Sequence, residues 1–393
     1  MKIDVNRLAM LEATKNVAKV APTNSPVEAL NGVLVECNDD TGEVYLTATN
    51  CEVSVQQKVM ASVGESGAML VNSRMLVGMM SLLESEFVTL TAEKPEVLTV
   101  NGGRCVYTIN CLPSKSYPKP TMPFPEESVI MKGICSLVKR TTFAVSRDES
   151  KPALQCVNIK IKNNSVHAAA SDGIRMMLVK DSAEPTDEQE FLLPGRSLQM
   201  LASVSSDSDV FEVSDLGNEV VFVRGDMMFV IRKMVTGDFI DTTAVVRYVK
   251  PAYSAVADAG KLREALDLIS IGALVGDTRV PINLVLSNGE IILTCNSEYS
   301  EANITIPANV LKDTPDTGFF YDVSALTKLF QVVGGKVKLE LDARGFMLIR
   351  TRNEVYFQAP VQPRAKKSIP AKGGKGEKET KSAKGARGEK EVA

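Results

Sequence analysis

Three short stretches repeat one pattern: EVYLTATNC at Glu43–Cys51, SVHAAASD at Ser165–Asp172 and EIILTCNS at Glu290–Ser297. In each stretch apolar and polar residues alternate, and small polar residues end the run, which predicts a strand followed by a turn. The copies lie about 125 residues apart, which indicates a tandem array of three similar domains. Arrays of this kind usually build a shape, so we expect the shape itself to carry the function.

A second piece follows each strand some 20 to 30 residues later. The pieces are MLVNSRMLVGMMSLL (Met69–Leu83), FLLPGRSLQMLASV (Phe191–Val204) and FFYDVSALTKLFQVV (Phe319–Val333). Each is predicted to be a strand that breaks at a polar or Pro/Gly turn and enters an amphipathic helix.

The remaining parts of each repeat complete a common order. An earlier amphipathic helix is predicted at about Val5–Val20, Lys132–Val145 and Gly260–Leu274. Asn163-Asn164 and Asn288-Gly289 suit hairpin turns, and a closing pair of strands ends each repeat. The predicted fold class is therefore α+β: three tandem copies of a domain with two helices packed on about eight antiparallel strands.

The repeat period sets the expected domain boundaries at residues 1–124, 125–250 and 251–364. The linkers are a proline-rich segment, Pro113–Glu127, and a stretch at about Val246–Ser254. Residues 365–393 contain almost no large apolar residues and are rich in Lys, Gly and Glu, so this tail is expected to be disordered.

Charge is unevenly distributed along the chain. The tail holds eight lysines, one arginine and four glutamates, or +5, which leaves −8 on the body because the whole chain carries −3. An acidic body argues against a general nucleic-acid coat, although it allows a local basic surface. For the tail two interpretations stand: a solvated extension that adds solubility, or a weak electrostatic arm for DNA or RNA.

Composition is that of a soluble globular protein. No apolar run approaches the ~20 residues that span a bilayer, and the N-terminus lacks the apolar stretch of a secretory signal. The seven cysteines form no C-x-x-C pair and lie among apolar neighbours, so we interpret them as reduced core residues of a cytoplasmic protein.

Signs of catalysis are weak. The single histidine, His167, lies in an alternating strand, where a structural role is the commoner one, and no known catalytic or phosphate-binding motif appears. Asn101-Gly102-Gly103 is interpreted as a hairpin turn. No metal-ligand cluster stands out, so we expect neither metal nor cofactor, and no enzyme activity. A hydrolase with an unrecognised pair of carboxylates remains a distant alternative.

Cations collect on the predicted helices despite the acidic body. Lys132, Lys139 and Arg140 are spaced to share one side of a helix. Such a set without aromatic residues for base stacking favours a sequence-independent contact with phosphates over an ordinary solvated face. The candidate DNA-facing residues are Arg7, Lys15, Lys19, Arg74, Lys132, Lys139, Arg140, Arg147, Arg196, Lys261, Arg263 and Lys328.

Four motifs in order resemble the bacterial sliding clamps, the beta subunits of DNA polymerase III. These are GGRCVYTINCLPSKSYP (Gly102–Pro118), FAVSRDESKPALQCVNI (Phe143–Ile159), ASDGIRMML (Ala170–Leu178) and MVTGDFID (Met234–Asp241). The resemblance covers Met1–Arg364, and the three repeats fall where the family has its three domains. It implies a polymerase processivity factor: a head-to-tail homodimeric ring around double-stranded DNA, with helices lining the hole. The alternative is a non-catalytic β-rich scaffold of the same fold that does not encircle DNA.

The resemblance also implies a groove on the second and third domains where the polymerase and the clamp loader insert short apolar peptides. The residues carried over to this groove are Leu154, Ser171, Gly173, Ile174, Arg175, Met176, Ile240, Val245, Phe346, Tyr356, Phe357, Pro360 and Val361. Closure of the ring is expected to involve Tyr107 and Ile109 on the first domain, and Ile271 and Leu274 on the third.

Several positions depart from the family pattern. Ile174 stands where a histidine is usual, Ile240 where a proline is usual, and Ala244 where an arginine is common. The usual C-terminal strand is replaced by Ala359–Arg364 and the added tail. These departures indicate a changed peptide preference, and they favour either a divergent bacterial lineage or a phage-encoded member.

Overall fold

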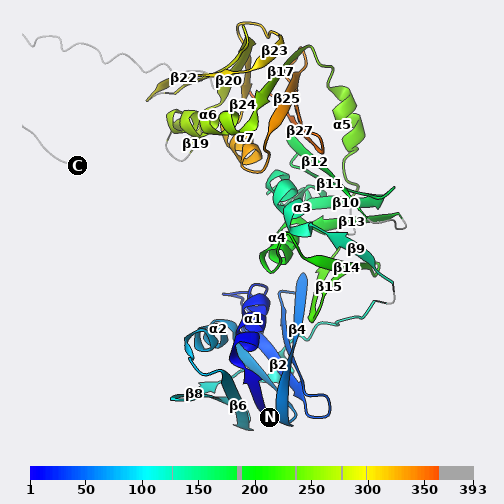
Figure 1. Cartoon of the computed structure of the whole chain (residues 1–393), viewed down its shortest axis with the longest axis vertical. Helices are drawn as coiled ribbons and strands as arrows, with labels where there is room; N and C mark the ends of the chain where they lie inside the picture. Colours follow the sequence, from blue (N-terminus) through cyan, green and yellow to red (C-terminus); the bar gives the residue numbers. More distant parts are fainter. Residues whose placement is uncertain (126, 184–187, 235–236, 276–277, 298, 363–393) are drawn as a thin grey trace, which may run out of the picture.

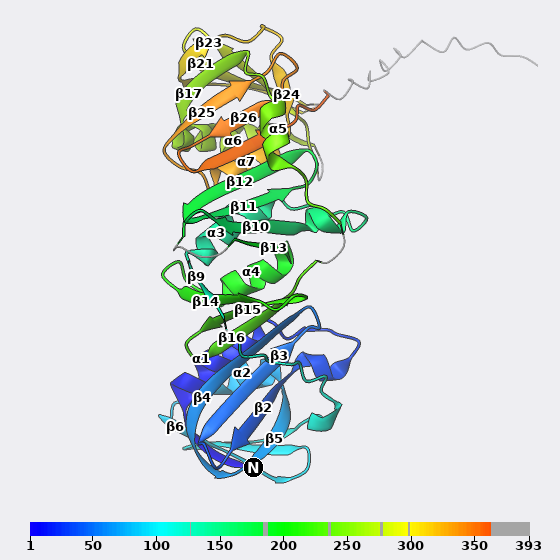
Figure 2. The same ribbon diagram turned by 90° about the vertical axis from the view of Figure 1, so that its right-hand side faces the viewer.

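The computed structural model describes residues 1–125, 127–183, 188–234, 237–275, 278–297 and 299–362, so the tail lies outside the described residues. Three units of similar construction follow one another along an elongated molecule (Figure 1). Their paired helices lie on one side of it, and the strands form the other side (Figure 2). The α+β repeat expected from the sequence is confirmed.

The first unit sets the pattern of ten elements. These are β1 (Lys2–Asn6), α1 (Arg7–Ala18), β2 (Gly32–Asn38), β3 (Glu43–Thr49), β4 (Val53–Glu65), β5 (Gly67–Asn72), α2 (Ser73–Leu82), β6 (Phe87–Lys94), β7 (Val97–Gly102) and β8 (Cys105–Asn110). Asn6 and Asn72 begin the two helices, because each side-chain oxygen accepts two backbone N–H groups of the first turn.

The second unit repeats this order. Its elements are β9 (Val129–Lys132), α3 (Ile134–Thr141), β10 (Cys156–Lys162), β11 (Ser165–Ser171), β12 (Arg175–Ser182), β13 (Gln189–Pro194), α4 (Gly195–Ser203), β14 (Val210–Asp215), β15 (Glu219–Arg224) and β16 (Met227–Arg232). Here the sequence expectation is partly wrong. Gly133 adopts a left-handed conformation (φ 68°) that ends β9 before the helix begins, so Lys132 lies on a strand and does not share a helix face with Lys139.

The third unit adds small elements to the same order. It comprises β17 (Tyr253–Asp258), α6 (Ala259–Gly272), β18 (Leu274–Val275), β19 (Thr278–Arg279), β20 (Ile282–Ser287), β21 (Glu290–Asn296), β22 (Glu301–Pro307), β23 (Asn309–Lys312), β24 (Phe319–Tyr321), α7 (Val323–Phe330), β25 (Lys336–Leu341), β26 (Met347–Arg350) and β27 (Glu354–Gln358). A further helix, α5 (Thr242–Tyr248), occupies part of the expected linker. Asp241 caps α5 through Thr243 and Ala244, and that capping residue is the sequence signal for the helix.

The predicted turns are confirmed. Asn163, Asn164, Asn288 and Gly289 all have positive φ, as the tightest hairpins require, and they join β10 to β11 and β20 to β21. Gly103 (φ 71°) turns β7 into β8. The cysteine prediction holds only in part, because five are buried but Cys51 and Cys105 are exposed.

Strand pairing continues across the unit boundaries. Each unit contributes two runs of strands, for example β5-β2-β3-β4 and β1-β6-β7-β8 in the first. β4 pairs with β16 of the second unit, and β12 pairs with β27 of the third, both antiparallel. These pairings build a 12-stranded and a 9-stranded sheet, so neighbouring units are joined by backbone hydrogen bonds.

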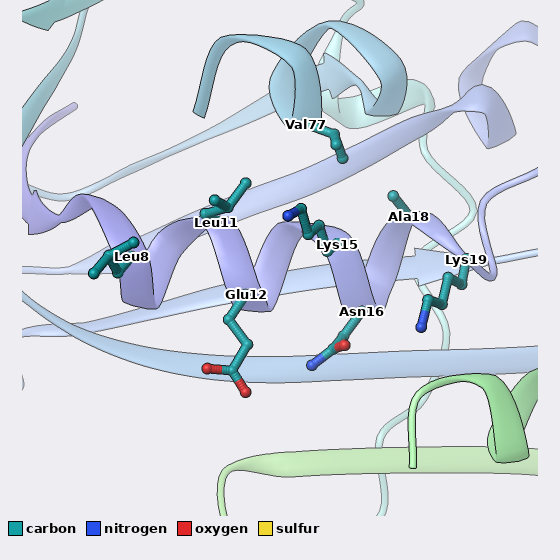
Figure 3. Close-up of a pocket in the computed structure, with 8 residues that line it drawn as sticks. All are labelled: Leu8, Leu11, Glu12, Lys15, Asn16, Ala18, Lys19 and Val77. Atoms are coloured by element: carbon teal, nitrogen blue, oxygen red, sulfur yellow. The ribbon is translucent and has the colours of Figure 1, made fainter. Parts of the chain in front are cut away.

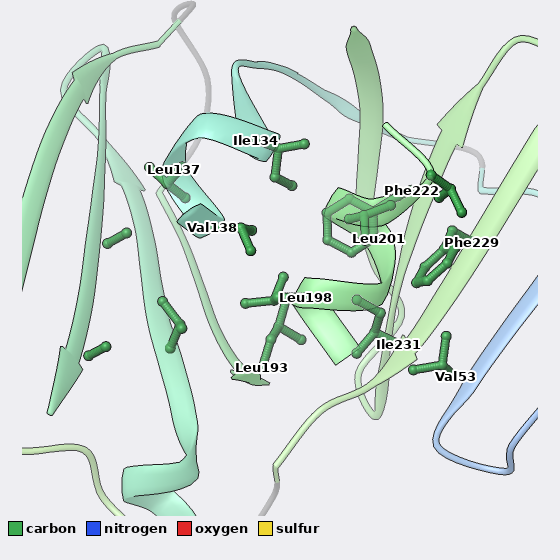
Figure 4. Close-up of a cluster of buried hydrophobic side chains, with 14 of the residues drawn as sticks. Val53, Ile134, Leu137, Val138, Leu193, Leu198, Leu201, Phe222, Phe229 and Ile231 are labelled. Carbon is green, nitrogen blue, oxygen red and sulfur yellow. The ribbon is translucent and has the colours of Figure 1, made fainter. Parts of the chain in front are cut away.

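The apolar core follows the sheets through these junctions. In the second unit Ile134, Leu137 and Val138 of α3 face Leu198 and Leu201 of α4 (Figure 4). Phe229 and Ile231 of β16 belong to the same buried cluster as Val53 of β4, across the first junction. A continuous core makes relative motion of neighbouring units costly.

Candidate functional site

The cationic candidates divide by exposure into two groups. Arg7, Arg140 and Lys328 are partly buried. The exposed candidates are Lys15, Lys19, Arg74, Lys132, Lys139, Arg147, Arg196, Lys261 and Arg263. Most of these lie on the paired helices, which form one side of the molecule.

Helix α1 shows how this helical side is built. Leu8, Leu11, Lys15 and Lys19 line a shallow open depression between α1 and α2, with Val77 on its far wall (Figure 3). The Lys19 ammonium donates to the backbone carbonyl of Ser203 on α4, so this cation also bridges the first and second units. The depression therefore offers apolar surface and positive charge together, with Glu12 the opposing carboxylate.

Arg140 is placed differently from the prediction. Its guanidinium is bound by Asp181 of β12 and by Glu354 of β27, at 3.3 Å in the second case, and its side chain is only 18% exposed. These two strands form the second junction. Arg140 therefore crosses the junction as a half-buried ion pair and is not a free surface cation, whereas neighbouring Lys139 is exposed beside Asp207.

Arg7 also has a structural role, since it donates to the carbonyl oxygens of Ser85 and Met80 at the end of α2. Lys328 lies near Arg147 and Arg175. Burial, together with these two positive charges, lowers the pKa of its ammonium group. This concentration of like charge between the second and third units favours an anionic neighbour there.

The loop between β11 and β12 presents the proposed partner groove. The Asp172 carboxylate accepts the backbone N–H groups of Ile174 and Arg175 at 3.0 and 2.9 Å and binds the Arg175 guanidinium at 2.8 Å. Gly173 adopts φ 91°, which other residues rarely tolerate. The tight loop holds Ile174 outward, 54% exposed, and its carbonyl accepts the N–H of Ala359.

Most other predicted groove residues meet in one apolar cluster. Met176, Phe357, Ile240, Val245 and Phe346 pack together with α5. Leu154, Pro360 and Val361 are half-buried, and Ser171 is buried with its hydroxyl donating to the Arg175 carbonyl. Tyr356 does not belong to the surface: it is 1% exposed, stacks on Phe143 in the main core, and its hydroxyl donates to Gln358.

Sequence reasoning missed Arg344 and Tyr248 at the edge of this cluster. The Arg344 guanidinium lies 4.2 Å from the Tyr248 ring centre and 4.9 Å from that of Phe346. It also binds the buried Asp342 carboxylate at 2.6 Å. A cation stacked on two rings and held by a buried acid is rigid. No local sequence pattern signals it, because Tyr248 and Arg344 lie 96 residues apart.

Among the described residues several strands pair on one side only, and β8 of the first unit and β22 of the third are two of them. β8 pairs only with β7, and β22 only with β21. On β8 Tyr107 is exposed, whereas Ile109 is 3% exposed and packs into the core of the single chain. On the third unit Ile271 and Leu274 are exposed as expected.

Exposed apolar residues accompany both edges. On the third unit, Leu268 lies one turn before Ile271 on α6. On the first unit, Leu82 ends α2 and Phe87 begins β6, and both side chains are exposed. Sequence reasoning did not assign these three residues to an interface. The sequence did contain a signal for Leu268, because helical spacing places this apolar residue on the otherwise polar face of α6.

Two kinds of feature are absent from the described part of the chain. Its acidic, histidine and cysteine residues form no group of three that could hold a metal ion. None of its helices is long and apolar enough to cross a membrane.

Comparison with known proteins identifies the fold. Residues 1–123 match the N-terminal domain of the DNA polymerase III beta subunit, and residues 129–241 match its central domain. The chain therefore belongs to the DNA polymerase III beta-subunit family, the sliding clamps.

Similar proteins include the beta sliding clamps of Chlamydia trachomatis and Streptomyces coelicolor. The first is 26% identical over 329 residues, which cover 81% of this chain and 76% of the relative; the second is 27% identical over 316 residues, covering 76% and 79%. The sliding clamp structure of Bacillus subtilis superposes with a TM-score of 0.85 at 19% identity, covering 92% of this chain and 99% of that one.

Proposed function

We propose that two copies of this chain close head to tail into a ring around duplex DNA and tether a replicative polymerase to it. The proposal rests on one pattern of strand pairing that both internal junctions share. At each one, the fourth strand of a unit pairs with the last strand of the next unit: β4 with β16, then β12 with β27. The corresponding strands, each with one open edge, are β8 of the first unit and, when the short β18 and β19 are left out, β22 of the third.

The same pattern extends to a second copy. If β22 of one copy pairs with β8 of another, the third junction repeats the first two, and two copies close the ring. The same pairing would also bring helices of the two copies together. α6 would approach α2 of the other copy, which brings Leu268 and Ile271 toward Leu82 and Phe87. Burial of these exposed side chains would add to the strand hydrogen bonds.

In such a ring the helices line the hole, and their exposed cations face the DNA. Phosphate contacts without base-reading groups permit sliding, because the ring holds DNA by topology and needs little affinity. A partner peptide bound in the groove keeps the polymerase at high local concentration near its template. We propose that the chain performs this role without a chemical step of its own.

Charge reversal on the helices tests the DNA face. Lys15→Glu combined with Lys139→Glu should remove two phosphate contacts. We therefore expect shorter retention on closed circular DNA, and a slope of log affinity against log salt that is shallower by about 2 on linear duplex. Lys94→Glu with Lys312→Glu, on exposed positions of β6 and β23, is the matched control. Equal losses in both double variants would show that net charge, and not a helical DNA face, governs retention.

Charge introduced at the groove tests partner binding. Ile174→Asp with Pro360→Asp places carboxylates where apolar peptide side chains are expected, so polymerase stimulation should fall by about tenfold or more. Ile174 is 54% exposed and Pro360 is half-buried, whereas Met176 is 1% exposed, so the fold should persist. Dimer mass and melting temperature are measured in parallel. Full stimulation by an intact double variant would place the partner site elsewhere.

A further inference from the structure

The outer face of the nine-stranded sheet carries a groove that shares only Ile240 with the proposed partner groove. It has a volume of about 830 Å³ and lies over β10, β11, β12 and β27. The segment from Asp238 to Thr243, which leads into α5, forms one wall. We call it the outer groove; its defining residues are Lys160, His167, Leu178, Lys180, Ile240 and Arg352.

The strand register arranges its floor in two rows. Asn158, Ala169, Leu178 and Val355 stand opposite one another across four strands and form a mainly apolar row. Two residues along each strand, Glu190, Lys160, His167 and Lys180 form a polar row on the same face. Leu178 and Val355 also pack against the cluster that contains Ile240. The groove thus sets an apolar row directly beside a basic one.

Positive charge in the outer groove exceeds what its carboxylates compensate. Glu190 binds Lys160 at 3.0 Å, and Glu354 is held by Arg140. Asp241 caps α5. Among the described residues, Lys180 and Arg352 form no ion pair, and Asp238 is the remaining carboxylate of the lining.

We propose that the outer groove docks an acidic, amphipathic segment of a partner protein. Its carboxylates would meet the row of Lys160, His167 and Lys180, with Arg352 at the rim, and its apolar side chains would cover Leu178 and Val355. Single-stranded nucleic acid fits less well, because Phe239 is the one aromatic residue of the described lining and no stacking platform exists. This docking does not depend on ring closure.

The single histidine of the chain lies on the floor of this groove and provides a reporter. Burial, then Lys180 and Lys162, lowers the pKa of His167, and its Nε2 atom lies 2.9 Å from the Ser165 hydroxyl. The charged groups near it are Lys160 and Lys162 on β10, Lys180 on β12, Glu190 on β13 and Asp238 on the wall. A bound carboxylate would raise this pKa, so the docked complex takes up protons and binds more tightly as pH falls.

The test uses the full-length protein and a labelled helical peptide of leucine and glutamate, with leucine along one stripe. Fluorescence anisotropy gives its affinity, and the His167 ring resonances give its location. We expect saturable binding that Lys180→Glu with Arg352→Glu weakens about tenfold or more and Leu178→Ser also weakens. Lys312→Glu, an equally exposed strand lysine, should leave it unchanged. His167→Gln should abolish the tightening between about pH 8 and pH 6.

Three outcomes would overturn the proposal. The first is that the peptide does not bind, or that it binds without shifting the His167 resonances. Polyglutamate of equal length binds as tightly, which would leave the apolar row without a role. Oligothymidylate competes for the groove with higher affinity than the peptide, which would make it a nucleic-acid site. None of these results bears on the ring or on the partner groove, which have their own tests.

Discussion

Ile271→Arg is expected to convert the closed dimer into monomers and to abolish retention on circular DNA. The Ile271 side chain is 74% exposed in the single chain, so arginine there should not disturb folding. In the proposed ring it is covered by the first unit of the other copy. Burial of an apolar side chain contributes about 1.5–3 kcal/mol, and the head-to-tail ring contains this contact twice. Loss of both contacts and burial of a charge should weaken dimerisation on the order of 10³-fold.

Light scattering during size-exclusion chromatography measures this effect at micromolar concentration. Met60→Arg is the matched control, because Met60 is 61% exposed and its strand β4 lies four strands from the β8 edge. The control should remain a dimer. A wild-type chain that is monomeric under these conditions would reject the ring and favour the scaffold function. A dimeric Ile271→Arg variant would place the interface away from α6.

Arg140→Met should destabilise the second junction more than any other single change on the helices. Arginine removal leaves Asp181 and Glu354 facing each other across β12 and β27 with no cation between them. Breaking a buried ion pair costs about 3–5 kcal/mol, and partial exposure of Asp181 reduces the expected loss to about 2–4 kcal/mol. Calorimetry or urea unfolding would measure it as a lower midpoint.

Two further variants separate this structural role from a role in DNA binding. Lys139→Met, one residue away but exposed, should leave the midpoint unchanged and shorten DNA retention. Replacing the whole triad by Arg140→Met, Asp181→Leu and Glu354→Met should recover part of the lost stability, because no charge is left uncompensated. If Arg140→Met melts like the wild type, the ion pair does not hold the junction.

Local features of the fold were predictable because their causes are local. Alternating strands, asparagine turns and capped helices depend on residues within a few positions of one another. Helix bounds differed where one backbone conformation intervened: Gly133 ended a strand where helical spacing had placed Lys132.

The candidate sites were predictable in kind but less so by residue. Met176, Ile240, Val245, Phe346 and Phe357 do meet in space, as the family resemblance implied. Ile109 lies between exposed neighbours and Tyr356 between a half-buried and a buried one, and the register of their sheets turns both inward. Which side of a strand faces the core depends on the pairing of distant strands, and one sequence does not reveal that pairing.

The sequence alone determined that this protein is a threefold repeat of a helix-and-strand unit with cations concentrated on its helices, because periodicity and charge are written along the chain. Only the tertiary structure decided which cations remain exposed and which strands keep an open edge. Lys139 and Arg140 are adjacent in sequence, but Arg140 is held by Asp181 and by Glu354, which is 214 residues away, whereas Lys139 is exposed beside Asp207. β8 and β22 keep an open edge, whereas β4 and β12 pair with strands of the next unit, and only the folded chain shows that difference.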